Sequence, residues 1–437
     1  MFRMSETDKN RSFALEVVRR LRDAGHESLW AGGCVRDQLL GKTPKDYDVA
    51  TSAQPHTIRE IFGHSRTLAV GAAFGVITVL GGRGARPIEV ATFRKDSQYS
   101  DGRHPDAVVF STAEEDAQRR DFTINGIFFD PLKGQVIDYV GGQADLQLKI
   151  VRAIRNPFER FDEDKLRMLR AIRFAANLEF TLEPSTLAAI QQLAGELVIV
   201  SAERIAGEME RLLCDPNRRR GLELLRTARL LPIVLPESVL LEADGEEVGS
   251  NSGRGEAWRQ SLAILDSLHA PTFPMTLAAL LRRCVTAGSE ENSVRKICSR
   301  WRLSQEVMKE TTWLLANEAA VRNAADLPWP RLQRILVAPF VCELLDYGQS
   351  VADILDGTRQ QIEYCRERLA WPVERLNPLP LLGGDDLIGA GWKPGPAFRE
   401  VIDRVRDAQL DGKITTREQA LSLAQQLVQP FRPTEKN

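Results

Sequence analysis

The sequence SLWAGGCVRDQLLGKTPKDYD occupies residues 28–48 and decides how the N-terminal part of the chain folds. A short apolar run leads into two glycines, a helix-compatible segment follows, and aspartates stand at 46 and 48. Glycines directly after a strand let backbone N–H groups approach phosphate oxygens closely, and Arg36 adds a positive charge. The order strand, glycine turn, helix and acidic pair therefore predicts an α/β domain that binds a phosphate-bearing ligand.

The two aspartates are candidate metal ligands. Asp46 and Asp48 are two residues apart, so on an extended segment both carboxylates point to the same side. Two such oxygen ligands suit Mg²⁺, which usually binds one or two carboxylates together with substrate phosphates. A solvated surface turn is the alternative for the pair taken alone. Glu89, on the predicted strand PIEVATF, and Asp121 are competing candidates for a third carboxylate, and a salt-bridged strand carboxylate is the alternative for Glu89.

The chain divides into two regions of different pattern. Its 437 residues are enough for two or more compact units. Up to about residue 150, helix-like stretches alternate with the β-rich runs SLWAGG, GVITVL, PIEVATF and INGIFF. Later windows carry helical apolar spacing, among them DKLRMLRAIRFAANL, AERIAGEMERLL, RGLELLRTARLL and AAVRNAADLPWPRLQRILV. We predict an α/β head and a helical remainder, with an exposed loop at 242–256 and a small final unit opening at 376–386.

Composition excludes several classes of protein. Hydrophobic residues make up 43% of the chain and charged residues 27%, which is typical of a water-soluble globular protein. No apolar run approaches the roughly 18 residues of a membrane-spanning helix, and the start MFRMSETDKN lacks the apolar segment of a secretory signal. We therefore expect a cytoplasmic protein with no membrane partner. The six cysteines show neither close pairing nor Cys/His ligand spacing, so we expect free thiols and no zinc site.

Positive charge is concentrated locally. The net charge of −2 excludes a protein that coats nucleic acid through overall basic charge. From Lys149 to Arg173, however, eight basic residues stand against four acidic ones, and from Arg211 to Arg229 six stand against two. Such stretches fit contacts to RNA phosphates, and a solvated helix face is the alternative.

The segment RRDFTIN, 119–125, carries two candidate nucleotide contacts. Arg120 suits a triphosphate, because a guanidinium donates several hydrogen bonds to phosphate oxygens. Asp121 suits a ribose hydroxyl, the group that distinguishes RNA precursors from DNA precursors. A structural ion pair is the alternative for both residues.

The segment EDKLR, 163–167, predicts a base-selecting pair. Helical i, i+3 spacing places Asp164 beside Arg167, while Leu166, Leu169 and Ile172 form the opposite, buried face. Cytosine and adenine both show an amino donor beside a ring-nitrogen acceptor, whereas uracil and guanine show a carbonyl beside a ring N–H. A carboxylate next to a guanidinium matches the first pattern and clashes with the second. The pair therefore fits selection of CTP and ATP without a nucleic-acid template, and an intrahelical salt bridge is the alternative.

Five motifs together resemble those of bacterial class II tRNA nucleotidyltransferases: GGCVRD with DYD, RRDFTIN, DPLKGQVIDYVGG, EDKLRMLRAIRF and SAERIAGEMERLL. Their order and spacing cover residues 33 to 213, and the segment that begins GGDDLIGAGW resembles the end of these enzymes more loosely. The resemblance implies a polymerase-β-like mixed sheet with helices in a head at 1–150. An all-α neck at 151–215, body at 216–375 and tRNA-binding tail at 376–437 would follow.

The resemblance also implies an activity, the addition of C, C and A to the 3′ end of tRNA from CTP and ATP. By carry-over, Asp46 and Asp48 bind the catalytic Mg²⁺, and the remaining matched positions contact the nucleotide: Gly33, Arg36, Arg120, Asp121, Asp164, Arg167, Arg170 and Arg173. DPLKGQVIDYVGG resembles a hinge-like motif of the family. No histidine stands near these motifs in a base-like arrangement, so we assign no general base beyond the metal-bound carboxylates.

Several alternatives stay open at this point. Poly(A) polymerases share the head motifs but generally carry a Gly-Arg-Arg-Phe type of stretch, where this chain has Val70–Gly75, VGAAFG. Segment 93–110 resembles the flexible loop of full CCA-adding members, which favours them over CC-adding ones; an enzyme that adds only the final A is harder to exclude. Antibiotic-type nucleotidylation would not need the arginine-rich helices, and a tRNA-binding protein with an inactive head would not keep the acidic pair.

Overall fold

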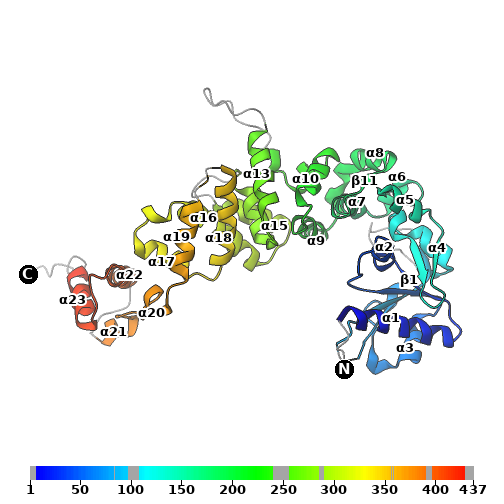
Figure 1. The fold of residues 1–437 in the computed structure, drawn as a ribbon, viewed down its shortest axis with the longest axis horizontal. Helices are drawn as coiled ribbons and strands as arrows, with labels where there is room; N and C mark the ends of the chain where they lie inside the picture. The colour runs from blue at the N-terminus through cyan, green and yellow to red at the C-terminus, as the bar shows by residue number, and fades with distance from the viewer. Residues whose placement is uncertain are drawn as a thin grey trace, which may run out of the picture. The chain divides into compact units, whose positions relative to one another are not determined.

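The structure is a computed structural model that describes residues 6–82, 84–96, 108–239, 255–284, 290–355, 357, 359–389 and 396–428. The chain separates into two compact units, Met1–Val239 and Leu240–Asn437 (Figure 1). We describe each unit by itself. The predicted loop at 242–256 lies outside the described residues as far as 254, and so do residues 97–107 of the predicted flexible loop.

A seven-stranded mixed sheet forms the centre of the first unit. The strand order is β3-β4-β5-β2-β1-β8-β9, and β2 pairs with β5 in parallel while the other neighbours are antiparallel. The bounds are β1 Ser28–Ala31, β2 Asp48–Thr51, β3 Thr67–Leu68, β4 Val76–Val79, β5 Ile88–Thr92, β8 Ile127–Asp130 and β9 Gln135–Asp138. The four predicted strand runs overlap β1, β4, β5 and β8, although INGIFF begins within the 3₁₀ turn Thr123–Asn125. The prediction of an α/β head is confirmed.

Strand β1 is buried on both faces, which makes it the core of the sheet. Leu29 and Ala31 point to one face, where they pack with Ala113 and Ala117 of helix α4 (Ala113–Arg119). Trp30 points to the other face, where Arg11 of helix α1 (Glu6–Asp23) lies over its ring at 5.8 Å. Helices therefore cover both faces of β1, as its continuous apolar sequence requires.

Short elements and helices complete the first unit. Strands β6 (Arg94–Asp96) and β7 (Val108–Phe110) pair with each other, as do β10 (Ile150–Val151) and β11 (Thr181–Leu182). Further helices in the described part of this unit include α2 Gly33–Leu39, α3 Pro55–Phe62, α5 Gly142–Leu148, α6 Pro157–Glu163, α7 Leu166–Asn177, α8 Pro184–Leu193, α9 Ala202–Leu213, α10 Arg218–Thr227 and α11 Leu231–Val234. Four 3₁₀ turns lie at His64–Arg66, Ala72–Phe74, Thr123–Asn125 and Ala194–Ile199. Helix α7 packs against both α9 and α10.

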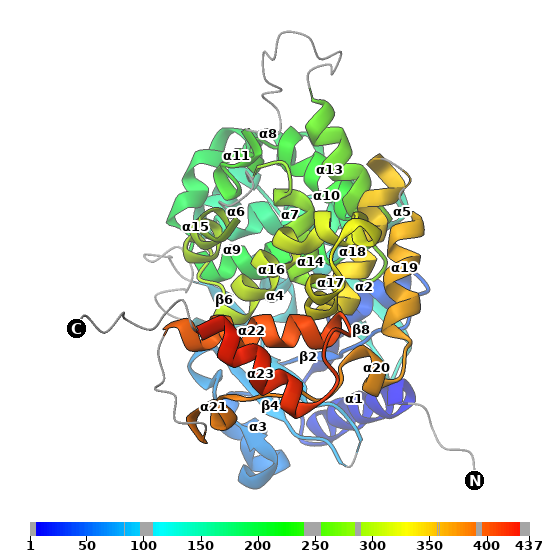
Figure 2. The same ribbon diagram turned by 90° about the vertical axis from the view of Figure 1, so that its left-hand side faces the viewer.

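The described part of the second unit is helical (Figure 2). Its elements are α13 Glu256–Ser267, α14 Phe273–Leu281, α15 Glu290–Arg300, α16 Gln305–Arg322, a 3₁₀ turn Ala324–Asp326, α17 Trp329–Leu336, α18 Val341–Leu355, α19 Arg359–Leu369, α20 Val373–Leu376, α21 Gly384–Gly389, α22 Pro396–Leu410 and α23 Arg417–Val428. Helices α14, α16 and α18 pack together. Helices α21 to α23 share a hydrophobic core of their own, which includes Leu387, Val401 and Ala424.

One predicted helical window is interrupted. The window AAVRNAADLPWPRLQRILV is not one helix, because α16 ends at Arg322 and α17 begins only at Trp329. Pro328 and Pro330 flank that start, and proline is tolerated in the first turn of a helix but not in its interior.

Two predictions from composition can also be compared with the structure. The six cysteines are free thiols, as predicted. In the described ranges no single helix is long and apolar enough to cross a membrane; α17 and α18 reach that length only when taken together, and they are bent by 110°.

Candidate active site

A pocket of about 770 Å³ lies in the first unit, and all ten residues predicted from the sequence line it. They are Gly33, Arg36, Asp46, Asp48, Arg120, Asp121, Asp164, Arg167, Arg170 and Arg173. Seven further residues complete the lining: Gly32, Arg119, Asn125, Leu166, Phe174, Arg204 and Arg211. The fold thus brings residues that are far apart in the sequence into one polar, arginine-rich site.

The turn between β1 and α2 forms one side of the pocket. Gly32 has φ 71° and ψ −129°, a backbone conformation that L-residues with side chains rarely adopt. A Cβ atom there would stand 3.2 Å from Nη1 of Arg120. Gly32 rather than Gly33 is therefore the position in this turn that requires glycine.

Asp48 is the first residue of β2 and Asp46 lies in a bend two residues before it, and both line the pocket. Asp46 accepts a hydrogen bond from Arg86 at 3.0 Å, while Asp48 begins β2 and is the register partner of Glu89 on β5. The pKa of Asp48 is raised to about 6, first because the pocket walls remove part of the water around its accessible carboxylate. The negative charges of Glu89 and Asp46 raise it further, and Arg120 opposes them.

The donor set at Asp46 and Asp48 fits a divalent cation. Crowded carboxylates are stabilised by a cation, and Mg²⁺ accepts two of them while keeping positions for water and phosphates. Among the described residues, no group of three or more His, Cys, Asp or Glu side chains is arranged to hold a metal ion. Of the two candidates for a third carboxylate, Glu89 is the register partner of Asp48 on the neighbouring strand but does not line the pocket, whereas Asp121 lines the pocket and accepts hydrogen bonds from Asn125 and Arg170.

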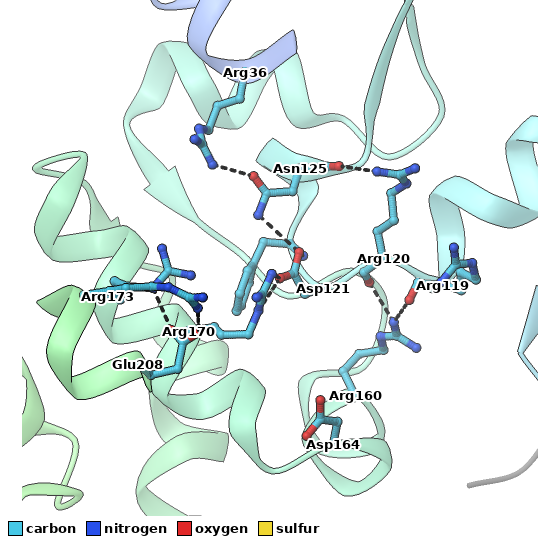
Figure 3. Close-up of polar contacts among 12 residues, drawn as sticks. Arg36, Arg119, Arg120, Asp121, Asn125, Arg160, Asp164, Arg170, Arg173 and Glu208 are labelled. Carbon is cyan, nitrogen blue, oxygen red and sulfur yellow. Dashed lines mark hydrogen bonds and ion pairs between the residues drawn. The ribbon is translucent and has the colours of Figure 1, made fainter. Parts of the chain in front are cut away.

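Asp121 belongs to a continuous line of polar contacts (Figure 3). Arg36 donates to Oδ1 of Asn125 at 2.8 Å, and the Asn125 amide donates to Oδ1 of Asp121 at 3.2 Å. Arg170 then donates to Oδ2 of Asp121 from Nε and Nη2, at 2.9 and 2.6 Å. This line connects α2 of the head with α7.

Arg120 is held by a carboxylate beneath the pocket. Asp116 is 1% exposed and accepts hydrogen bonds from Arg120 at 3.0 and 3.1 Å and from Arg119 at 2.8 Å. Burial raises the pKa of Asp116, but the two arginines outweigh it and hold the pKa below its usual value. Arg160 donates to the backbone carbonyls of Arg119 and Arg120, which fixes the same segment from the other side (Figure 3).

The predicted helical pair of Asp164 and Arg167 is wrong in its geometry. Helix α6 ends at Glu163 and α7 begins at Leu166, so Asp164 lies between them with extended backbone, φ −152° and ψ 103°. Its carboxylate accepts the backbone N–H of Leu166 at 3.1 Å, and such local bonds compete with helix formation. Arg167 bonds instead with Glu163 at 2.6 Å and with the carbonyl of Arg160 at 2.9 Å.

The buried face of this segment is mostly as predicted. Leu169 and Ile172 are buried, and Leu166 is buried too but also lines the pocket. Asp164 and Arg167 share the pocket even though they do not share a helix turn. The two side chains are therefore available to one ligand from separate backbone elements.

The ring of Phe174 lies against the guanidinium groups of three arginines that line the pocket. The guanidinium carbons of Arg36, Arg170 and Arg173 lie 5.3, 5.5 and 4.3 Å from the centre of its ring. Contacts of this kind contribute roughly 0.5 to 1 kcal/mol each. Arg173 also donates to the buried carboxylate of Glu208 at 2.6 Å (Figure 3).

Sequence reasoning missed Phe174, Arg204 and the buried carboxylates Asp116 and Glu208 as parts of the site. A signal existed for α9, because its first turns place Arg204, Glu208 and Arg211 on one face at i, i+4 and i+7 spacing. No local signal identifies the ion partners, since Arg204 and Asp164 are 40 residues apart and Arg173 and Glu208 are 35 apart.

Two family models match the chain. A model described as the poly A polymerase head domain matches residues 29–152, and one described as a probable RNA and SrmB-binding site of polymerase A matches residues 179–240. The matched ranges contain the glycine turn, the acidic pair and helix α9.

Relatives of the whole chain are similar over nearly its full length. The chain is 34% identical to the CCA-adding enzyme of Limosilactobacillus fermentum, over 93% of this chain and 94% of that protein. It is 33% identical to the CCA-adding enzyme of Lacticaseibacillus paracasei, over 94% and 95%. Among solved structures, the Bacillus stearothermophilus CCA-adding enzyme in complex with CTP matches with a TM-score of 0.71 and 27% identity, covering 97% of this chain and 98% of that one.

Proposed function

Because this chain belongs to the family of CCA-adding enzymes, we propose that it adds C, C and A to the 3′ end of tRNA from CTP and ATP. It is a nucleotidyltransferase and releases diphosphate. The observation that carries the proposal is the convergence of the acidic pair, the phosphate-binding arginines and the Asp164–Arg167 set in one pocket of about 770 Å³. The cytoplasm, where tRNA precursors and nucleoside triphosphates occur together, is its proposed place of action.

In the proposed reaction the 3′-hydroxyl of tRNA gives up its proton to a carboxylate of the acidic pair, and its oxygen attacks the α-phosphorus of the bound nucleotide. The bond from that phosphorus to the bridging oxygen of the β-phosphate breaks, and diphosphate leaves. Asp46 and Asp48 would hold Mg²⁺, which would supply stabilisation of the negative charge that develops during the transfer. Glu89 is the better candidate for a third carboxylate beside Asp46 and Asp48. Asp121 is less available for that role, because it already accepts hydrogen bonds from Phe122, Asn125 and Arg170.

The arginines of the pocket bind the triphosphate and ribose. Gly33 is the first residue of α2 and Arg36 lies one turn further along it. Arg120 lines the same pocket and donates hydrogen bonds to Asp116. Arg170 and Arg173 extend the positive wall along α7. Asp121 already accepts four hydrogen bonds, from the Phe122 N–H, from Asn125 and two from Arg170, which fill the roughly four acceptor positions of an ionised carboxylate. In the proposed complex a ribose hydroxyl therefore replaces one of these donors.

Asp164 and Arg167 select the base. An acceptor-only carboxylate receives the amino group of cytosine or adenine, and the guanidinium donates to the neighbouring ring nitrogen. Uracil and guanine would present a carbonyl to the carboxylate and an N–H to the guanidinium, which leaves both side chains unsatisfied. The same two side chains therefore serve both substrates without a template.

The domain assignment follows the family layout. We assign a head at 1–150, a neck at 151–215, a body at 216–375 and a tRNA-binding tail at 376–437. The head and neck supply all the residues that line the pocket. Full-length relatives named as CCA-adding enzymes do not favour an enzyme that adds only A, nor a poly(A) polymerase.

The test uses purified protein and three tRNA transcripts that end before CCA, after C, and after CC. Each is incubated with Mg²⁺ and with CTP, ATP or both, and products are resolved to one nucleotide. We expect growth to CCA from every transcript and then a stop. Addition of A only to the CC-ending transcript, or long A tails, would contradict the proposal.

A further inference from the structure

Asp164 lies between α6 and α7, and its carboxylate accepts a hydrogen bond from a third helix, α9. Nη2 of Arg204, on α9, donates to Oδ2 of Asp164 at 2.7 Å, and the backbone N–H of Leu166 donates to Oδ1 at 3.1 Å. Each carboxylate oxygen thus has one protein donor and, with two lone pairs, keeps one acceptor position. The side chains of Asp164 and Arg204 are 14% and 22% exposed, and both line the pocket.

Helix α9 is itself fixed against α7. Glu208, one turn after Arg204, is 3% exposed and accepts hydrogen bonds from Arg173 of α7 at 2.6 Å and from Arg211 at 3.0 Å. A buried carboxylate with two arginine partners cannot move without exposing an unpaired charge, which is costly. Arg204 therefore projects from an anchored helix, and its guanidinium holds the Asp164 carboxylate in one orientation.

We infer that Arg204 is a positioning residue that determines nucleotide specificity by fixing the orientation of the Asp164 carboxylate. This inference rests on the proposed function, in which Asp164 accepts the amino group of the base. Asp164 has extended backbone in a connection between two helices, so its own backbone does not restrict the side chain as a helix would. Without Arg204, the carboxylate rotates about its side-chain bonds and loses the alignment that distinguishes an amino group from a carbonyl.

The test measures kcat/KM for single-nucleotide addition of CTP and of UTP to a tRNA transcript that ends before CCA. The variants are Arg204→Ala, Arg204→Gln, Asp164→Asn and the double variant Arg204→Ala with Asp164→Asn. Arg219→Ala is the matched control, because Arg219 pairs with Glu223 on the surface of α10 and does not line the pocket. Arg204→Gln keeps much of the side-chain length and replaces the alanine variant if that variant does not fold.

We expect the ratio of kcat/KM for CTP over UTP to fall roughly 10- to 100-fold in the Arg204 variants, the size of one lost hydrogen bond to a charged group. Arg219→Ala should keep the wild-type ratio. In the Asp164→Asn background, removal of Arg204 should change the ratio no further, because its effect runs through Asp164.

Two results would overturn the inference. One is an Arg204 variant whose CTP-to-UTP ratio matches that of the wild type, and the other is an additive loss in the double variant, which would mean that Arg204 contacts the nucleotide independently. Failure of the proposed function looks different, because the wild-type protein itself would then not add C to the transcript.

Discussion

Asp121 and Arg170 form a partly buried ion pair in which Nε and Nη2 of Arg170 both donate to Oδ2 of Asp121, at 2.9 and 2.6 Å (Figure 3). Burial by itself would raise the pKa of Asp121. The charge of Arg170, with hydrogen bonds from Arg170, Asn125 and the Phe122 N–H, instead lowers the pKa to about 2. The pair therefore fixes the segment after α4 against α7 with an ionised carboxylate.

The first prediction concerns the stability contributed by this pair. A carboxylate whose pKa falls from 3.8 to about 2 on folding contributes about 2 kcal/mol to the free energy of unfolding at neutral pH. Since the folded-state pKa is the lower one, the contribution is complete above about pH 5 and is lost as the pH falls towards 2. Asp121→Asn should therefore be less stable at pH 7 by about 2 kcal/mol or more, and the difference should narrow towards pH 3.

Urea denaturation of wild type and Asp121→Asn at pH 7, 5, 4 and 3 checks this prediction. Asp23→Asn, at the exposed end of α1, serves as the control and should match the wild type at each pH. A difference between Asp121→Asn and wild type that stays constant down to pH 3 would contradict the assigned charge state.

The second prediction concerns the acidic pair. Asp46→Asn and Asp48→Asn should each lower nucleotide addition on the order of 1,000-fold, because several kcal/mol of transition-state stabilisation are lost with the metal. Binding of tRNA, measured by filter retention, should stay near the wild-type value, since these side chains act on the reacting phosphate. Substantial residual transfer in either variant would remove Asp46 and Asp48 from the metal site.

Metal removal gives an independent readout of the same site. EDTA should abolish transfer by the wild type, and Mg²⁺ should restore it. Mg²⁺ with CTP should also raise the melting temperature of the wild type more than that of Asp48→Asn, because a ligand that binds only the folded state stabilises it. Equal shifts in both proteins would place the metal elsewhere.

The third prediction concerns the support beneath Arg120. Asp116→Asn should cost about 3 kcal/mol in unfolding free energy, because Arg119 and Arg120 lose a carboxylate that is 1% exposed. The variant should also raise KM for CTP and ATP, as Arg120 loses its orientation. Glu115→Gln is the control, since its pair with Lys95 is exposed and contributes at most about 1 kcal/mol. An Asp116 variant as stable as this control would contradict the argument.

The fourth prediction compares two glycines. Gly32→Ala should destabilise the protein by about 2 kcal/mol and lower activity, since φ is 71° and the new Cβ would approach Arg120. Gly207→Ala lies in the middle of α9, where no heavy atom from outside the helix comes within 4 Å of the place that the new methyl group would take. This substitution should instead stabilise the protein by roughly 0.5 to 1 kcal/mol. Thermal unfolding of both variants decides between these opposite signs.

The strands and the residues of the pocket were predictable because their signals are local. Short apolar, β-rich runs separated by glycine-bearing turns identified β1, β4, β5 and β8, and motif order identified residues that the fold then brings together. The break between α16 and α17 also has a local signal, the prolines at 328 and 330 beside Trp329. The window was nevertheless predicted as helical, because its apolar residues keep helical spacing on both sides of the break.

The contacts inside the pocket were not predictable, since they depend on which helices meet. Spacing alone favoured a helical pair of Asp164 with Arg167. Asp164 instead lies between α6 and α7, where its carboxylate accepts hydrogen bonds from the Leu166 N–H and from Arg204. The buried positions of Asp116 and Glu208 follow from packing of α4 and α9, and the sequence does not distinguish these two carboxylates from the exposed acidic residues beside them in the same helices.

The most direct test of the central claim is the equilibrium affinity of the protein for CTP, ATP, UTP and GTP in the presence of Mg²⁺ and without tRNA. If one pocket selects the base through Asp164 and Arg167, CTP and ATP should bind at least roughly 10-fold more tightly than UTP and GTP. That preference should disappear in Asp164→Asn. Equal binding of all four nucleotides, or a preference that survives in Asp164→Asn, would contradict the claim that these side chains select the nucleotide.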